Sequence, residues 1–288
     1  MNEWLELYLN YLREIKGASK NTISAYATDL KQFLAYLQDE NITDFNKISD
    51  VRMKAYQLHL KKSGKSNATM SRSLVSIKKF MLFLIRKRVI DEDPTECVRP
   101  PKVEKSTPKV IPYEQVNALL QAPDVRLPQG RRDRALLELL YATGMKASEL
   151  IMLKVSDINL KFGCVTINQD GHERVLPFGS MVKQTLIDYL SDINHQEFLF
   201  CTRFGNPFTR QGIWKLVKEY ASLAKLEEEI SLQTIRNSFA AHMIENGADI
   251  KSIQELLGVT EVIAAQRFVK NGSNETLSTY QRTHPRSK

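Results

Sequence analysis

Small polar residues accompanied by basic ones stand at the expected starts of several helices in this chain. They occur in the runs Ser19–Thr22, Ser66–Arg72 and Thr209–Gln211. A hydroxyl at such a position caps free backbone N–H groups, and the start of a helix attracts anions. A Lys or Arg beside it adds a positive charge, so each run is suited to hold a phosphate group. Taken singly, each residue could equally be an exposed helix cap.

The charge of the chain favours a partner of the same kind. The 288 residues include 41 Lys and Arg against 33 Asp and Glu, a net charge of +8, and the pI is about 9.2. Neutralising phosphates with Lys and Arg releases counterions, which favours a polyanionic partner. Between residues 52 and 105 the acidic residues are few and the basic ones include Arg52, Lys54, Lys61, Lys62, Lys65, Arg72, Lys78, Lys79, Arg86, Lys87 and Arg88. A solvated helix face usually mixes both signs, so this excess favours a DNA-facing surface.

The composition argues against several other classes of protein. Apolar residues make up 42% and charged residues 26%, which is typical of a soluble globular protein. Neither a membrane span nor a secretory leader is expected, because Met1–Trp4 opens directly into an amphipathic pattern. Cys97, Cys164 and Cys201 lack metal-ligand spacing, which predicts small buried thiols in a reducing cytoplasm. No metal or nucleotide cofactor is expected, since no ligand cluster or phosphate-binding glycine loop is present.

Hydrophobic spacing predicts an N-terminal helical domain over residues 1–93. Apolar residues recur at helical spacing from Trp4 to Ile15, Gly17 ends that run, and Ser19 caps the next helix. Two more helices are expected, at about 49–62 and from Ser66 onward. Half of the ten prolines then fall between residues 94 and 112. Because proline breaks helices and removes backbone donors, residues 94–112 are predicted to form an extended basic linker.

Residues 113–288 are predicted to combine helices with a small β-sheet. The segments Val165–Ile167 and Val175–Leu176 flank the turn pair Asp170-Gly171, which indicates a hairpin, and a short strand is expected at Phe198–Phe200. The helices are expected at about 113–121, 131–142, from 147, 181–193, 209–224, 234–245, 249–257, 260–269 and 274–282. The expected fold class is therefore mainly α with a small β-sheet.

Several motifs follow one another in the order that tyrosine recombinases show. Ala142–Leu150 resembles their box I, Glu173–Gly179 their second hairpin strand and Thr209–Trp214 their T-R-Q-G-F-W helix, while residues 231–257 resemble box II. Gly17–Thr22 is similar to their core-binding domain, and Tyr280–Arg286 resembles the tail of the bacterial Xer group. The resemblance covers essentially the whole chain. It implies an N-terminal SAM-like helical domain and a C-terminal recombinase-type α+β domain that clamp a DNA duplex.

The resemblance also implies a reactive site, and the chain departs from it at nearly every position. In the family two arginines hold the scissile phosphate, a lysine protonates the leaving oxygen, two histidines assist and a tyrosine attacks. The corresponding positions here are Lys146, Gln169, Gln233, Arg236, Val259 and Phe268, of which only Arg236 keeps the family's residue. A phenyl ring cannot attack phosphorus, glutamine is no general acid at neutral pH, and lysine lacks the guanidinium fork. The sequence therefore predicts a protein that holds DNA without cutting it.

Other titratable residues near these motifs are predicted to have structural roles. Tyr280 is considered as a replacement nucleophile, but it matches an ordinary tail residue of the family and is expected to pack. Tyr141, Tyr220 and His242 are likewise expected to pack at helical positions. Glu149 is expected to act as an acidic partner that stabilises its helix.

The predicted DNA contacts lie in both domains, and two further hypotheses stay open. The contacts are Lys20, Asn21, Thr22, Ser66, Asn67, Thr69, Ser71, Arg72, Lys78, Lys79, Lys146, Arg174, Thr209, Arg210, Gln211, Lys215 and Arg236. One alternative is an active recombinase with unorthodox residues or with catalysis supplied by a partner subunit. The other is an interaction scaffold that regulates an active recombinase, with residues 274–288 contacting a neighbouring subunit. The expected location is the cytoplasm, in association with the nucleoid.

Overall fold

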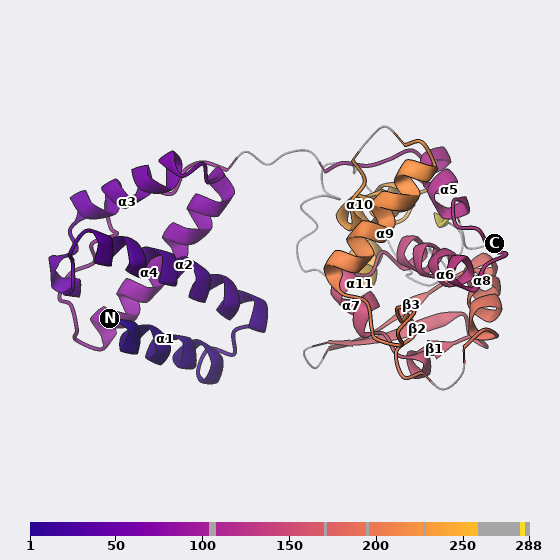
Figure 1. The fold of residues 1–288 in the computed structure, drawn as a ribbon, viewed down its shortest axis with the longest axis horizontal. Coiled ribbons are helices and arrows are strands. Elements are labelled where there is room, and N and C mark those ends of the chain that lie inside the picture. Colours follow the sequence, from indigo (N-terminus) through magenta and orange to yellow (C-terminus); the bar gives the residue numbers. More distant parts are fainter. Residues whose placement is uncertain (104–107, 170–171, 194–195, 227–228, 259–282, 286–288) are drawn as a thin grey trace. The chain divides into compact units, whose positions relative to one another are not determined.

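The chain forms two compact units, residues 1–106 and 107–288 (Figure 1). This computed structural model describes the chain except for residues 104–107, 170–171, 194–195, 227–228, 259–282 and 286–288. The sequence-based bounds of 1–93, 94–112 and 113–288 stay a prediction. No helix of the described residues is long and apolar enough to cross a bilayer.

The first unit is a helical module in which α4 (Asn67–Arg86) contacts each of the other three α-helices described there. Its core is aromatic: the rings of Phe33 and Tyr56 are 4.9 Å apart, and those of Tyr8 and Phe80 are 5.3 Å apart. Its elements are α1 (Asn2–Glu14), α2 (Lys20–Asp39), the short 3-10 helix Phe45–Lys47, α3 (Asp50–Lys62) and α4 (Asn67–Arg86). The predicted all-helical first domain is confirmed.

Hydroxyl caps fix where the helices begin, as the sequence predicts for α2. The Ser19 hydroxyl accepts a hydrogen bond from Thr22 N at 3.2 Å, and Ser66 does the same for Thr69 N at 3.2 Å. In the second unit Thr209 accepts from Gly212 N at 3.0 Å. Each cap satisfies a backbone donor that the first helical turn leaves without a partner.

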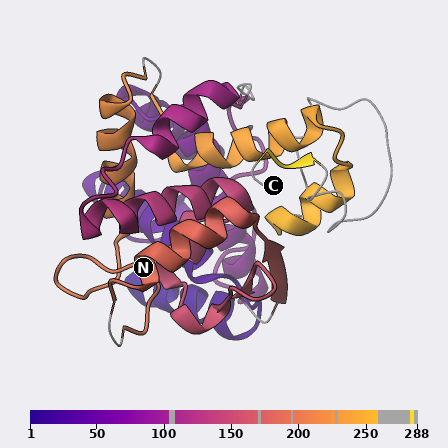
Figure 2. The ribbon, with the colours of Figure 1, turned by 90° about the vertical axis from the view of Figure 1, so that its right-hand side faces the viewer.

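The second unit has a small antiparallel sheet of order β1-β2-β3 along one side of its helices (Figure 1). The helices α6 (Pro128–Thr143) and α8 (Ser180–Leu190) lie side by side, as Figure 1 and Figure 2 both show. The strands are β1 (Ile158–Asn159), β2 (Cys164–Gln169) and β3 (His172–Pro177). The α-helices are α5 (Tyr113–Gln121), α6 (Pro128–Thr143), α7 (Ala147–Met152), α8 (Ser180–Leu190), α9 (Arg210–Leu223), α10 (Leu232–Glu245) and α11 (Ile250–Leu257).

The hairpin is confirmed, whereas the strand expected at Phe198–Phe200 is wrong. Thr166 pairs with Val175 in the hairpin register. Phe198 makes only an isolated bridge with Lys154. The partner segment turns at once into the 3-10 helix Val155–Asp157, so no ladder can continue. The two-residue strand β1 is not predicted from the sequence.

The cysteines are less buried than the sequence predicts. The predicted buried thiols are confirmed only for Cys201, because Cys164 is half-buried and Cys97 is exposed. Cys97 lies in the turn that follows Pro94, and turns lie on the surface. The helices expected at 260–269 and 274–282, with Phe268 and Tyr280, fall outside the described residues.

Candidate nucleic-acid interface

Glu149 is the buried anion around which the predicted phosphate-holding residues gather. It is the third residue of α7, and its Oε2 accepts a hydrogen bond from Lys146 N at 2.7 Å, so it caps its own helix. This matches the predicted helix-stabilising role. Its side chain is only 1% exposed. Burial raises the pKa of Glu149, but hydrogen bonds from Arg174 and Lys146 outweigh burial and hold the pKa below its usual value.

Arg174 of β3 pairs with this carboxylate through both ends of its guanidinium. Its Nη1 is 3.1 Å from Glu149 Oε1 and its Nη2 is 2.7 Å from Oε2, while Nε donates to Leu256 O at 3.1 Å. This bidentate geometry is the strong form of a charge-assisted hydrogen bond. The pair ties β3 to the start of α7 and to the end of α11. No local sequence pattern indicates this partnership, because the two residues come from separate elements.

Arg236 of α10 is buried and bonds to backbone carbonyls. Its Nη1 donates to Gly144 O and its Nη2 donates to Leu257 O at 2.7 Å. The residue is 8% exposed. Burial lowers the pKa of Arg236 to about 10, although Glu149 acts in the opposite direction. Even so, the guanidinium remains charged near neutral pH and supplies fixed positive charge beneath the surface.

Lys146 is the accessible member of the group that we call the Glu149 cluster (Lys146, Glu149, Arg174 and Arg236). Its side chain is 42% exposed, and its Nζ is 3.6 Å from Glu149 Oε1. The cluster has three cations and one carboxylate, which leaves an excess of two positive charges. Lys146 is therefore the cation of the cluster that a phosphate could reach most easily from solvent.

Of the other positions that match reactive residues of the family, Gln169 and Gln233 are among the described residues. Gln233 is exposed on α10, and its Nε2 donates to Asn237 Oδ1 at 2.9 Å. Gln169 ends β2 and pairs with His172 across the hairpin. Val259 and Phe268 fall outside the described residues.

Some predicted DNA contacts of the first unit are exposed, whereas others already bond to residues of the same unit. Lys20 and Asn21 are exposed at the start of α2, and Lys78 is exposed on α4. Arg72 pairs with the buried Asp29 at 3.1 Å. Others bond within the unit: Thr22 to Ser19, Ser66 to Thr69, Asn67 to Lys102 O and Lys79 to Tyr26, while Ser71 is half-buried.

In the second unit, the start of α9 presents a compact set of exposed polar groups. Arg210, Gln211 and Lys215 are all exposed, and Thr209 caps the helix. Neither Arg210 nor Lys215 forms an ion pair within the described part of the chain. Such uncommitted cations at a helix start are suited to neutralise phosphates.

Sequence and structure comparisons identify the family. The Phage integrase family matches residues 109–275, and the SAM-like N-terminal domain of phage integrases matches residues 5–88. The chain is 37% identical to tyrosine recombinase XerD of Staphylococcus epidermidis, over all of both chains. This chain belongs to the phage integrase family of tyrosine recombinases. It is also 36% identical to XerD of Staphylococcus aureus, again over the full length of both chains.

Solved structures of the family share the fold of this tyrosine recombinase family member. A lambda integrase dimer bound to a COC' core site gives a TM-score of 0.75 at 20% identity, covering 96% of this chain and 97% of that one. The XerH recombinase bound to its difH substrate gives 0.70 at 21% identity, covering 93% and 80%. The predicted fold class, with a SAM-like helical domain before an integrase-type domain, is confirmed.

The packing predictions for Tyr141, Tyr220 and His242 are confirmed. Tyr141 is fully buried and shares a hydrogen bond of 2.9 Å with His242 Nδ1. Tyr220 donates to the buried Asp133 at 2.8 Å. No group of three or more His, Cys, Asp or Glu within the described residues could hold a metal ion. The prediction that no metal or cofactor is used stays a prediction.

Proposed function

We propose that this family member binds duplex DNA and does not cleave it. The observation that supports the proposal best is the Glu149 cluster, where Lys146, Arg174 and Arg236 come together from three separate elements. A phosphate placed on Lys146 would be held by an excess positive charge. The DNA-bound lambda integrase and XerH structures, which share the fold, support the choice of duplex DNA.

Sequence departures support the loss of cleavage. The position that matches the family's nucleophile is Phe268, whose ring has no hydroxyl. Gln169 and Gln233 can donate neutral hydrogen bonds but cannot transfer a proton at neutral pH. The residues that hold a phosphate therefore keep their charge, while those that would move protons or form a covalent bond do not. This combination favours a DNA clamp over a cutting enzyme.

Duplex binding is tested by fluorescence anisotropy at several salt concentrations. We expect affinity to fall steeply with salt, because counterions are released when phosphates are neutralised. Lys215→Gln should weaken binding and reduce the slope of log affinity against log salt by about 1. Lys218→Gln is the matched control one turn away, since Lys218 is already paired with Glu229 at 3.1 Å. Affinity that stays flat with salt would contradict the proposal.

The loss of cleavage is tested separately with a nicked suicide substrate. An active recombinase would become trapped on such DNA as a covalent adduct that survives a denaturing gel. We expect no adduct from the native chain. An adduct would instead support the alternative of an active enzyme with unorthodox residues, and Tyr280→Phe would then test the source of its nucleophile.

We further propose that the protein assembles with a neighbouring subunit on DNA and is associated with the nucleoid. Related lambda integrase structures are a dimer and a tetramer on DNA, which supports assembly. The candidate contact is the segment 274–288. Of this segment residues 283–285 are described, and Thr283 and His284 are buried in the second unit. The rings of His284 and Tyr141 are 5.3 Å apart.

Removal of residues 274–288 should leave binding of one subunit intact and abolish assembly on a longer duplex. Because this truncation also removes the packing of His284, the full-length His284→Ala variant is the control. Assembly that survives truncation would contradict the role of this segment. If both the truncated chain and His284→Ala fail to assemble, the loss is caused by the missing packing of His284 and not by a lost contact with the neighbouring subunit.

A further inference from the structure

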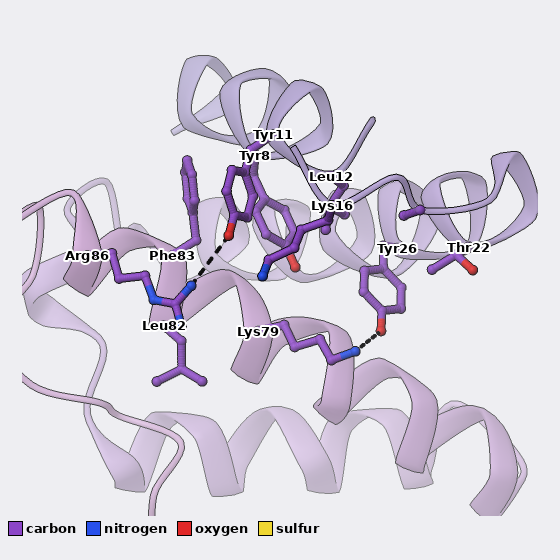
Figure 3. Close-up of a pocket in the computed structure, with 11 residues that line it drawn as sticks. Tyr8, Tyr11, Leu12, Lys16, Thr22, Tyr26, Lys79, Leu82, Phe83 and Arg86 are labelled. Atoms are coloured by element: carbon purple, nitrogen blue, oxygen red, sulfur yellow. Dashed lines mark hydrogen bonds between the residues drawn. The ribbon is translucent and has the colours of Figure 1, made fainter. Parts of the chain in front are cut away.

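The first unit contains a pocket that the proposed function does not use. It lies between α1, α2 and α4 and has a volume of about 380 Å³ (Figure 3). Its walls are mostly apolar, formed by Leu12, Leu82 and Phe83 and by the rings of Tyr8 and Tyr11. This volume falls within the range of small-molecule sites, which are concave and largely apolar with few polar groups.

Three cations line this pocket, and none of the lining residues is acidic. They are Lys16, Lys79 and Arg86. Lys79 Nζ donates to Tyr26 Oη at 2.9 Å, and Arg86 Nη1 donates to Tyr11 Oη at 3.4 Å (Figure 3). Both partners are neutral phenols. Within the described residues these cations have no ion pair, so their charge is uncompensated at the pocket.

A buried hydroxyl faces the same space. Tyr8 is 1% exposed, and its Oη has no hydrogen-bond partner among the described residues. A buried donor without a partner is costly and uncommon, which points to a ligand that completes it. In Figure 3 the Tyr8 hydroxyl and the Lys16 amino group point into the space between the helices. Burial raises the pKa of Tyr8, so the hydroxyl stays protonated and can donate.

We propose that this pocket binds a small organic anion that has an aromatic or aliphatic body and one carboxylate or phosphate group. The apolar walls would take the body. Lys16, Lys79 and Arg86 would neutralise the anionic group, and the Tyr8 hydroxyl would donate to it. Thr22 and Lys79 also belong to the predicted DNA contacts, so an occupant would compete with the duplex. This competition rests on the proposed function, whereas the binding of the anion does not.

The first test uses naphthyl phosphate as the probe, titrated into the full-length chain without DNA by isothermal calorimetry. Naphthol is the matched control, because it keeps the aromatic body and lacks the charge. We expect saturable binding of naphthyl phosphate at one site and at least about tenfold weaker binding of naphthol. Equal affinities, or no saturable binding of the phosphate, would overturn the proposal.

Single substitutions then locate the site. Tyr8→Phe keeps the ring and removes the hydroxyl, so probe affinity should fall by about tenfold while the melting temperature of the free protein does not fall. Arg86→Gln should weaken the probe by a similar factor. Lys87→Gln is the control, since Lys87 is exposed next to Arg86 and does not line the pocket. Probe affinity that none of these pocket variants changes would overturn the assignment.

A third measurement separates a free organic anion from the phosphates of DNA. Tyr8→Phe should leave duplex affinity unchanged, because the buried hydroxyl is outside the predicted DNA contacts, and naphthyl phosphate should lower duplex affinity in the native chain. If the duplex binds but naphthyl phosphate does not, Lys16, Lys79 and Arg86 bind only DNA phosphates and the proposed anion pocket is wrong. If naphthyl phosphate binds and the duplex does not, the pocket stands and the proposed DNA binding fails.

Discussion

Arg174 and Glu149 meet end to end in the second unit, with Nη1 3.1 Å from Oε1 and Nη2 2.7 Å from Oε2. The two residues are far apart in sequence, on β3 and α7, and the carboxylate is almost fully buried. The same carboxylate caps α7 and lies 3.6 Å from Lys146 Nζ. One buried anion therefore orders the positive groups that we propose to hold a phosphate.

Removal of this anion should destabilise the second unit. Glu149→Gln keeps the shape of the side chain but leaves Arg174 without a charged partner in a buried site. Breaking a buried pair from one side costs about 3 kcal/mol of unfolding free energy, which denaturant titration measures. Glu173→Gln makes the same change at an exposed position on the same strand and should cost far less. Equal effects of the two variants would show that the pair contributes little.

Substitution of Gly144 by alanine should destabilise the fold more than the same substitution of Gly17, because only Gly144 is closely surrounded by side chains. Both residues have positive φ, +59° and +56°. A Cβ on Gly144 would lie 2.4 Å from Phe239 Cδ1 and 2.9 Å from Leu257 Cδ2, while a Cβ on Gly17 meets nothing within 4 Å. We expect Gly144→Ala to cost about 3 kcal/mol and Gly17→Ala about 1 kcal/mol in thermal or denaturant unfolding. The difference isolates the clash, and similar costs would contradict it.

The Glu149 cluster can be predicted only in part from the sequence. Motif order predicts that Lys146, Gln169 and Arg236 belong to one region, and helical spacing and turn residues predict the helices and the hairpin. The bond between Arg174 and Glu149, however, depends on how β3 packs against α7, and no local pattern encodes that. The pocket of the first unit was missed for the same reason, since Tyr11 and Arg86 meet only after α1 packs on α4.

His242 should make the stability of the second unit depend on pH. Burial lowers the pKa of His242, and its Nδ1 shares a hydrogen bond with Tyr141. In the unfolded chain this imidazole takes up a proton below about pH 6.5, while in the folded chain it stays neutral to lower pH. The stabilisation is therefore present above about pH 6.5 and is lost as pH falls toward the folded-state pKa.

As the pH falls through this range, protonation of one group lowers the free energy of unfolding by at most about 1.4 kcal/mol per pH unit. His242→Gln should reduce the slope between pH 7 and pH 5 in a series of denaturant titrations. His59→Gln, at an exposed histidine of the first unit, should leave the slope of the second unit in place because His242 remains. A slope that His242→Gln does not alter would assign the pH dependence to other groups.

On the proposed loss of cleavage, a hydroxyl supplied at position 268 alone should not produce cleavage. Phe268→Tyr supplies a hydroxyl, but Lys146, Gln169 and Gln233 still lack the fork and the proton-transfer groups, and each such loss costs about a hundredfold or more. The combined variant Lys146→Arg, Gln169→Lys, Gln233→His, Val259→His and Phe268→Tyr should form a covalent adduct on the nicked suicide substrate. The same variant with Phe268 kept is the control and should form none. An adduct from Phe268→Tyr alone would mean that the remaining residues are still sufficient for catalysis, and that only the hydroxyl separates this chain from an active recombinase.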